Sequence, residues 1–164
     1  MRKELISPAK LDQQLRNIWP DESSDRWLDL ERLAIVQVTS EEDGFSIDSA
    51  LLPGGQTGWR ASSEEVQTIR MIFDQPQNLT RIWLAFDEPA DTRTQEFLRR
   101  WSPDKGRSFK EIVRQEWNFS PPYSCREVEN YSVELAGVNV LELIIVPDKS
   151  GKPAKASLAK LRLA

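Results

Sequence analysis

The segment VQTIRMIFDQPQNLTRIWLAF, residues 66–86, decides the fold class of this chain. Apolar side chains recur at every second position from Ile69 to Phe73 and again from Ile82 to Phe86. A spacing of two residues is typical of a β-strand that buries one of its faces. The stretch between these runs, DQPQN, is rich in residues that favour turns. The segment therefore predicts two neighbouring strands joined by a turn.

The same extended pattern continues on both sides of this segment. β-Branched residues accumulate upstream of it, and turn-forming residues separate short apolar runs downstream, as in DEPAD (87–91), SPDKG (102–106) and LAGVN (135–139). The predicted strands are Ala34–Thr39, Val66–Phe73, Leu79–Phe86, Gln95–Ser102, Phe109–Phe119, Tyr131–Leu135, Val138–Val146 and Ala156–Leu163. Strands of this length and spacing are typical of a β-sandwich or a barrel. We therefore expect an all-β fold.

The first residues of the chain have a helical pattern instead. In SPAKLDQQLRNIW, residues 7–19, apolar residues recur at i, i+4, i+7 and i+8, and Ser7 and Pro8 suit the first positions of a helix. A chain of 164 residues is most often a single domain. We expect a helical extension over residues 1–30, followed by one β-sandwich domain over residues 31–164.

Cysteine content and hydropathy predict the compartment. Cys125 is the single cysteine, which excludes an internal disulfide framework and fits a reducing cytosol. The N-terminal residues lack the apolar core segment of a secretory signal. The longest apolar run, LIIV from Leu143, is far shorter than the ~20 residues that span a bilayer. We expect a cytoplasmic protein without a membrane partner.

Charge and histidine content exclude several classes of function. The net charge of −4 weighs against a nucleic-acid partner. The chain has no histidine, which excludes a Ser-His-Asp triad, a Cys-His dyad and an HExxH zinc site. The acidic cluster Asp87–Glu88–Asp91 lacks the spacing of an EF-hand loop. We expect no enzyme, catalytic residue, metal or cofactor, although a carboxylate pair of the glycosidase kind stays open from sequence alone.

Arginines lie among aromatic residues in RTQEFLRRWSPDKGRSFKEIVRQEWNF, residues 93–119. Pro103 and Gly106 predict a hairpin turn in its middle. On the two faces of the preceding strand, Arg99 and Arg100 each lie between apolar neighbours. An arginine in that position pairs with a carboxylate, extends to solvent or contacts a ligand, because burial of an unpaired charge is costly. The predicted partners are Glu96, Glu111 and Glu116.

The strongest candidate for a binding surface is RQEWNFSPPYSCRE, residues 114–127. Aromatic residues fall there at a strand end and in a proline-rich loop beside arginines, and flat rings with guanidinium groups suit the stacking and hydrogen bonding of sugars. The alternative is that Trp117 and Phe119 fill the core. Over the whole chain, the candidate ligand-binding residues are Arg60, Arg93, Arg114, Trp117 and Tyr123.

Four motifs also resemble a known superfamily. They are a tryptophan-containing segment at Trp59, an F-D-x-P strand end at 73–76, the strand Ile82–Phe86, and an S-x-D-x-G hairpin at 102–106. In this order they resemble the discoidin-like, galactose-binding-like β-sandwich superfamily, and residues 30–164 are similar to short bacterial proteins described as carbohydrate-binding-like. The resemblance implies an antiparallel jelly-roll of two sheets and roughly eight strands, with ligands bound by loops at one end.

Members of this superfamily bind sugars, phospholipid head groups or proteins, so the resemblance leaves the ligand open. Our leading hypothesis is a non-enzymatic module that binds a carbohydrate or a similar polar small molecule through its end loops. The alternative is a cytoplasmic protein-interaction or scaffold domain, in which the arginines pair with structural carboxylates.

Overall fold

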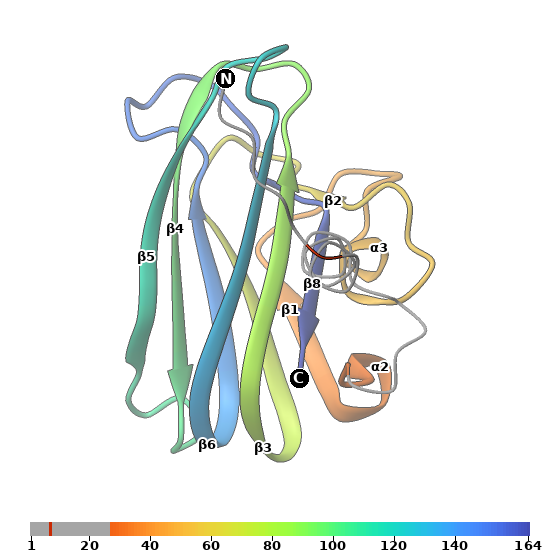
Figure 1. The fold of residues 1–164 in the computed structure, drawn as a ribbon, viewed down its shortest axis with the longest axis vertical. Helices are drawn as coiled ribbons and strands as arrows, with labels where there is room; N and C mark the ends of the chain where they lie inside the picture. Colours follow the sequence, from red (N-terminus) through yellow and green to blue (C-terminus); the bar gives the residue numbers. More distant parts are fainter. Residues whose placement is uncertain (1–6, 8–26) are drawn as a thin grey trace.

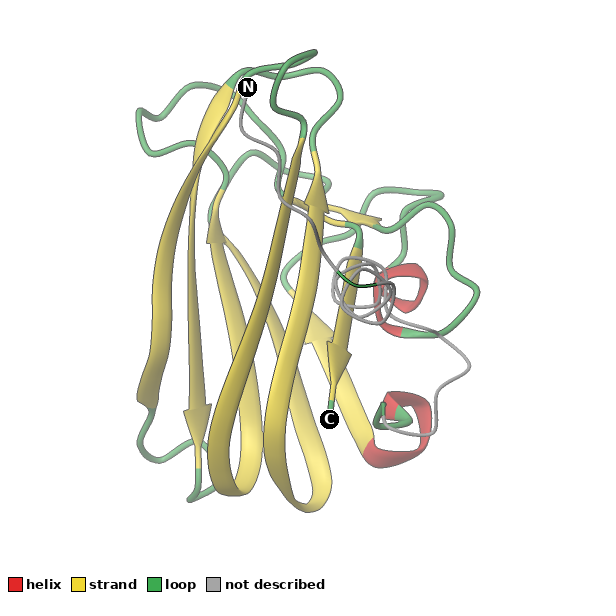
Figure 2. Cartoon of the chain, viewed as in Figure 1, coloured by secondary structure: helices red, strands yellow, loops and turns green. Residues whose placement is uncertain are grey.

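The computed structural model describes Ser7 and residues 27–164, so all of the predicted N-terminal helix at 7–19 except Ser7 lies outside the described residues. The described part is mostly antiparallel β-structure with two short helices, α2 (Leu30–Leu33) and α3 (Ile47–Leu51) (Figure 2). The strands are β1 (Ala34–Val38), β2 (Trp59–Arg60), β3 (Gln67–Asp87), β4 (Arg93–Ser102), β5 (Lys110–Phe119), β6 (Arg126–Val146), β7 (Ser157–Leu158) and β8 (Lys160–Leu163). The all-β prediction is confirmed.

Two long strands, β3 and β6, pair with each other in an antiparallel ribbon that bends in its middle. Their register runs from Gln67 opposite Ile145 to Asp87 opposite Arg126, with shifts in the middle of the ribbon. Each strand turns back on itself at the same end of the molecule (Figure 1). The chain therefore reverses where DQPQN and LAGVN predict turns, but the prediction that these turns separate four strands is wrong, since β3 and β6 continue through them.

The bent ribbon contributes strands to both layers of the sandwich. Residues 69–73 of β3 pair with β1, and residues 67–72 pair with the second half of β6, which is followed in the sheet by β4 and β5. Residues 82–87 of β3 pair instead with β8 and with the first half of β6. Facing layers bury the inner positions of both, which is the arrangement of a β-sandwich.

The apolar residues predicted at every second strand position form the hydrophobic core. Alternating residues of β3 and β6 are buried, as predicted: Ile69, Met71, Phe73, Ile82, Leu84, Phe86, Leu141, Leu143 and Ile145. Residues 82–86 of β3 are buried at every position, so this run is covered on both faces. The loop before β2 turns Trp59 into the core, as predicted, where its Nε1 donates to the carbonyl oxygen of Ser40 at 2.9 Å.

The connections gather at two opposite ends of the sandwich. The loops after β3, β5 and β6 lie at one end, which we call the loop rim (Figure 1). The bends of β3 and β6 and the β4–β5 hairpin lie at the other end. In this hairpin Gly106 has φ 86°, which matches the left-handed conformation that the sequence predicts there. The fold therefore offers two separate rims for binding.

Candidate functional site

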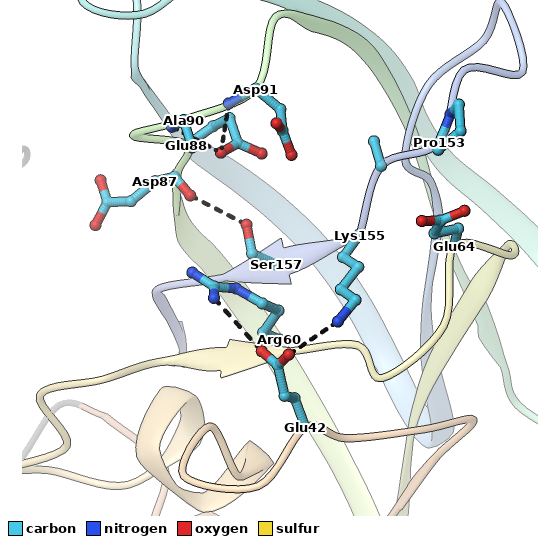
Figure 3. A pocket seen from close by; sticks show the side chains of 11 residues that line it. Glu42, Arg60, Glu64, Asp87, Glu88, Ala90, Asp91, Pro153, Lys155 and Ser157 are labelled. Atoms are coloured by element: carbon cyan, nitrogen blue, oxygen red, sulfur yellow. Dashed lines mark hydrogen bonds and ion pairs between the residues drawn. The ribbon is translucent and has the colours of Figure 1, made fainter.

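A cleft of about 230 Å³ opens at the loop rim (Figure 3). Four segments that are distant in sequence form it: the loop after β1, strand β2 with the residues after it, the loop after β3, and the loop before β7. Its ionisable residues are Glu42, Arg60, Glu64, Asp87, Glu88, Asp91 and Lys155. The cleft is therefore a polar site with more acids than bases, and no aromatic residue lines it.

Glu42 holds the two cations of this rim cleft. Its carboxylate accepts from Lys155 Nζ at 2.9 Å and from Arg60 Nη1 at 3.4 Å, as Figure 3 shows. The hydrogen bond from Lys155 holds the pKa of the Glu42 carboxyl below its usual value. Arg60 also lies over the ring of Phe45, with 4.3 Å from Cζ to the ring centroid. These contacts fix the direction in which both cations approach the cleft.

Arg93 supports the rim from below. Its side chain is fully buried and its Nε lies 2.7 Å from Glu88 Oε1, while its Nη1 donates to the carbonyl oxygen of Pro147 at 2.9 Å. Glu88 Oε2 in turn accepts the backbone N–H groups of Ala90 and Asp91, both at 3.2 Å. Arg93, at the start of β4, therefore links the loop after β3 through an ion pair to the loop after β6 through a hydrogen bond.

The five candidate ligand residues do not form one cluster. Arg60 lines the rim cleft, and Arg93 lies beneath the same rim, where its donors bind protein groups. Arg114 lies on β5 and pairs with carboxylates, Trp117 is half-buried against the core, and Tyr123 is 93% exposed in the loop after β5. The structure thus brings Arg60 and Arg93 to one end and leaves Arg114 apart from them.

Two residues of the rim cleft were missed by the sequence interpretation. Glu42 belongs to a run of loop acids, and Lys155 lies in the lysine-rich segment 148–162, which is typical of a solvated edge. Their ion pair joins positions 113 residues apart. No local pattern reports a contact of this kind, because it depends on how the loops after β1 and β6 meet at the rim.

The prediction that Glu96, Glu111 and Glu116 pair with Arg99 and Arg100 is wrong, because these carboxylates pair with other cations. Arg114 Nη1 lies 2.6 Å from Glu96, and Arg114 Nε lies 3.2 Å from Glu111. Glu116 pairs with Lys149 instead of an arginine. Arg100 binds a carboxylate that was not predicted, the buried Glu142, at 2.7 Å. These pairs explain how β4 and β5 carry several charges without any ligand.

Arg99 is the exception, because it is buried without a carboxylate contact. Its three guanidinium nitrogens have no hydrogen-bond partner among the described residues. The guanidinium lies over the ring of Tyr131, with 4.0 Å from Cζ to the centroid. Burial lowers the pKa of Arg99 to about 10. The charge is therefore desolvated, with partial compensation from the ring of Tyr131 and from the nearby carboxyl groups of Glu129 and Glu127.

We expect the replacement Arg99→Met to leave the free energy of unfolding unchanged or to raise it by roughly 1 kcal/mol, because an apolar side chain of similar length removes a poorly compensated charge. Urea unfolding at neutral pH measures this. Arg100→Met is the matched control: it should destabilise, since it leaves the buried carboxylate of Glu142 with one partner fewer. A clear loss of stability in Arg99→Met would contradict the interpretation.

The chemistry available in the rim cleft is hydrogen bonding. Carboxylates accept from hydroxyl groups, and the Arg60 and Lys155 cations donate to oxygen. Within residues 27–164 the structure contains no group of three or more acidic or cysteine side chains placed to hold a metal ion. In the same part of the chain, neither helix has the length and hydropathy to cross a membrane. The cleft is thus suited to a small polyhydroxyl ligand.

Comparison with known proteins identifies the fold. No family model matches the chain, and no curated protein matches its sequence. The family 32 carbohydrate-binding module of Clostridium perfringens NanJ, solved in complex with galactose, superposes with a TM-score of 0.62 at 13% identity, over 84% of this chain and 97% of that one. This chain has the galactose-binding-like β-sandwich fold. The resemblance that the sequence motifs suggest is confirmed at the level of the fold.

Other solved structures share the galactose-binding-like fold with this chain. The family 32 module of AlyQ in complex with 4,5-unsaturated mannuronic acid has a TM-score of 0.60 at 14% identity, over 84% of this chain and 97% of that one. Reduced XRCC1 bound to the catalytic domain of DNA polymerase β has a TM-score of 0.57 at 12% identity, over 81% of this chain and 95% of that one. Proteins of this fold therefore include both sugar-bound and protein-bound examples.

Proposed function

We propose that this galactose-binding-like domain is a non-enzymatic binding module that takes a neutral carbohydrate, or a similar uncharged polyhydroxyl molecule, in the rim cleft. The observation that carries the proposal is the arrangement of Arg60 and Lys155 around Glu42, with further carboxylates across the cleft. Vicinal hydroxyls of a sugar both donate and accept, so they suit a site that presents anchored cations and carboxylates together.

Charge favours a neutral ligand over an acidic one. The cleft is lined by the acids Glu42, Glu64, Asp87, Glu88 and Asp91 and by the bases Arg60 and Lys155. Five acids and two bases give a formal charge of −3, which the neighbouring Arg93, paired with Glu88, and Arg126, paired with Asp87, reduce to −1. A uronic acid or a phosphate would approach this site against its own charge. Binding of a small neutral sugar without an aromatic platform is expected to be weak, with Kd on the order of 1 mM.

We expect D-galactose to shift the backbone amide signals of residues 42, 60, 87, 88, 90, 91 and 155 in a two-dimensional NMR titration of the full chain. Galacturonate, which differs by one carboxylate, should bind roughly tenfold more weakly. The variant Lys155→Met should weaken galactose binding severalfold, because it removes one anchored donor. The control Lys152→Met changes an exposed lysine outside the cleft. A galactose titration that leaves all these signals in place would refute the proposal.

The second candidate function is protein interaction, and Tyr123 favours it. This side chain is 93% exposed at the loop rim, and exposed tyrosines are common anchors in interfaces. A cytoplasmic location, which we infer from the single cysteine, also suits a protein partner. A crosslinking amino acid placed at position 123 should capture one stoichiometric partner in cells if this function holds. Capture of many proteins in small amounts would count against it.

A further inference from the structure

A hollow larger than the rim cleft lies away from the loop rim. It is a groove of about 770 Å³ at the opposite end, between the bend of β3, the β4–β5 hairpin and β6. Its volume lies in the range of small-molecule sites. Apolar side chains form much of its lining, including Ile72, Phe109 and Val140. This hairpin-end groove combines size and apolar surface that the rim cleft lacks.

A buried carboxylate positions two arginines beside the groove. Glu142 is fully buried on β6, and its oxygens lie 2.6 Å from Arg70 Nε and 2.7 Å from Arg100 Nε. Arg70 lines the groove, and Arg100 lies over the ring of Phe109, which also lines it, with 4.1 Å from Cζ to the centroid. Since one carboxylate serves two guanidinium groups, one positive charge is left uncompensated in a fixed geometry.

Both arginines keep donors for a further acceptor. Their side chains are 43% and 35% exposed, and Glu142 engages only the Nε of each. Among the terminal nitrogens, Arg70 Nη1 donates to Gln37 at 3.3 Å. The Arg100 terminal nitrogens have no hydrogen bond to any described residue. The Nη groups are therefore placed to donate hydrogen bonds to an oxygen atom of a ligand that lies against the apolar side of the groove.

Lys105 adds a third cation at the mouth of the groove. It is an exposed hairpin residue with φ 60°, and its backbone N–H donates to Asn139 Oδ1 at 3.1 Å, which holds the hairpin against β6. The opposing acids are Glu142 and the exposed Asp74. The formal net charge around the groove is therefore +1, from the cations Arg70, Arg100 and Lys105 and these two acids. By contrast, the whole chain has a net charge of −4 and the rim cleft is negative.

We propose that the hairpin-end groove is a second binding site, which takes a small amphipathic carboxylate. The apolar body of the ligand lies against Ile72, Phe109 and Val140, and its carboxylate accepts hydrogen bonds from the terminal nitrogens of Arg70 and from Lys105. Arg100, which lies over the ring of Phe109, adds a positive charge beside the groove. An acidic group without an apolar body would leave that wall exposed to water, and a neutral apolar molecule would leave the cations unused. Both features of the ligand follow from the lining.

Two matched probes test the site by calorimetry and NMR: naphthalene-2-carboxylate and its uncharged analogue naphthalene-2-carboxamide. We expect the carboxylate to bind roughly tenfold more tightly than the carboxamide. Lys105→Glu should remove most of this difference. The matched control Lys152→Glu makes the same charge change at the loop rim and should preserve it. Equal binding of the two probes, or equal effects of the two variants, would overturn the proposal.

The design separates the two sites. Lys105 and Lys152 are both exposed, so neither variant is expected to unfold the protein, and a thermal melt of each confirms this. The carboxylate should shift the amide signals of residues 72–75, 105–109 and 139–140 and leave those of the rim cleft unchanged. If it shifts rim signals instead, the ligand belongs to the rim cleft and the groove is not its site. A failed galactose titration leaves this result unaffected.

Discussion

Replacing Glu88 by alanine is expected to lower the free energy of unfolding by roughly 3–5 kcal/mol. The side chain of Arg93 is fully buried, and Glu88 is the carboxylate that pairs with it, at 2.7 Å. Without Glu88 the guanidinium keeps only neutral acceptors, such as Gln95 Oε1 and the carbonyl oxygen of Pro147. A buried charge that loses its counter-charge retains its desolvation cost. Urea unfolding of the variant and the natural protein measures the difference.

Two further variants show whether the buried ion pair is the cause. Asp91→Ala removes an exposed acid from the same loop and should change stability by less than about 0.5 kcal/mol. Glu88→Gln retains a side-chain acceptor for Arg93 but not the negative charge. Its loss of stability should therefore be smaller than that of Glu88→Ala and larger than that of Asp91→Ala. Comparable losses in Glu88→Ala and Asp91→Ala would mean that the loop, and not the ion pair, sets the effect.

The same ion pair illustrates what sequence could and could not predict about the site. That Arg93 was a candidate residue was predictable, because it lies just before a predicted strand, Gln95–Ser102, where the end loops meet. Whether its donors would face a ligand or a neighbouring loop was not, since this depends on the packing of the loop after β6. Arg60 and Lys155 meet at Glu42 for a similar non-local reason, and their local sequences gave no sign of it.

The strands were more accessible to prediction than the site. The alternation of apolar and polar residues, together with the turn residues, locates β3, β4, β5 and the second half of β6. This works because the apolar face of each strand follows from its own local sequence. The first half of β6 was predicted to begin only at Tyr131, whereas the strand begins at Arg126. Its early inward positions are Glu127 and Glu129, which face the core side beside Phe86 and Leu84. Acids at inward positions remove the apolar signal on which the prediction depends.

These inward acids have a consequence for stability. Glu127 is fully buried, and its Oε2 has no hydrogen-bond partner among the residues that the structure describes. Its other oxygen accepts from Gln95 Nε2 at 3.4 Å. Burial, reinforced by the neighbouring Glu129, raises the pKa of the Glu127 carboxyl to about 8. The folded protein therefore keeps Glu127 protonated at pH values where the unfolded chain has released that proton.

Stability should consequently fall as the pH rises through this window. In the unfolded chain Glu127 ionises near its usual pKa of 4.5, and in the folded protein it ionises near 8. Its contribution is complete below pH 4.5, declines as the pH rises from there, and is lost above about 8. Glu127→Gln cannot ionise and should lack this decline. At pH 8.5 we expect the variant to be more stable than the natural protein by roughly 1–3 kcal/mol.

Urea unfolding of both proteins between about pH 5 and 8.5 tests this. The difference in the free energy of unfolding should grow steadily with pH, because the natural protein alone must ionise a buried carboxyl. Glu134→Gln changes an exposed acid of the same strand. Its free energy of unfolding should depend on pH in the same way as that of the natural protein over the whole range. A difference between Glu127→Gln and the natural protein that stays constant with pH would show that the amide changes packing only and that Glu127 is not held protonated by burial.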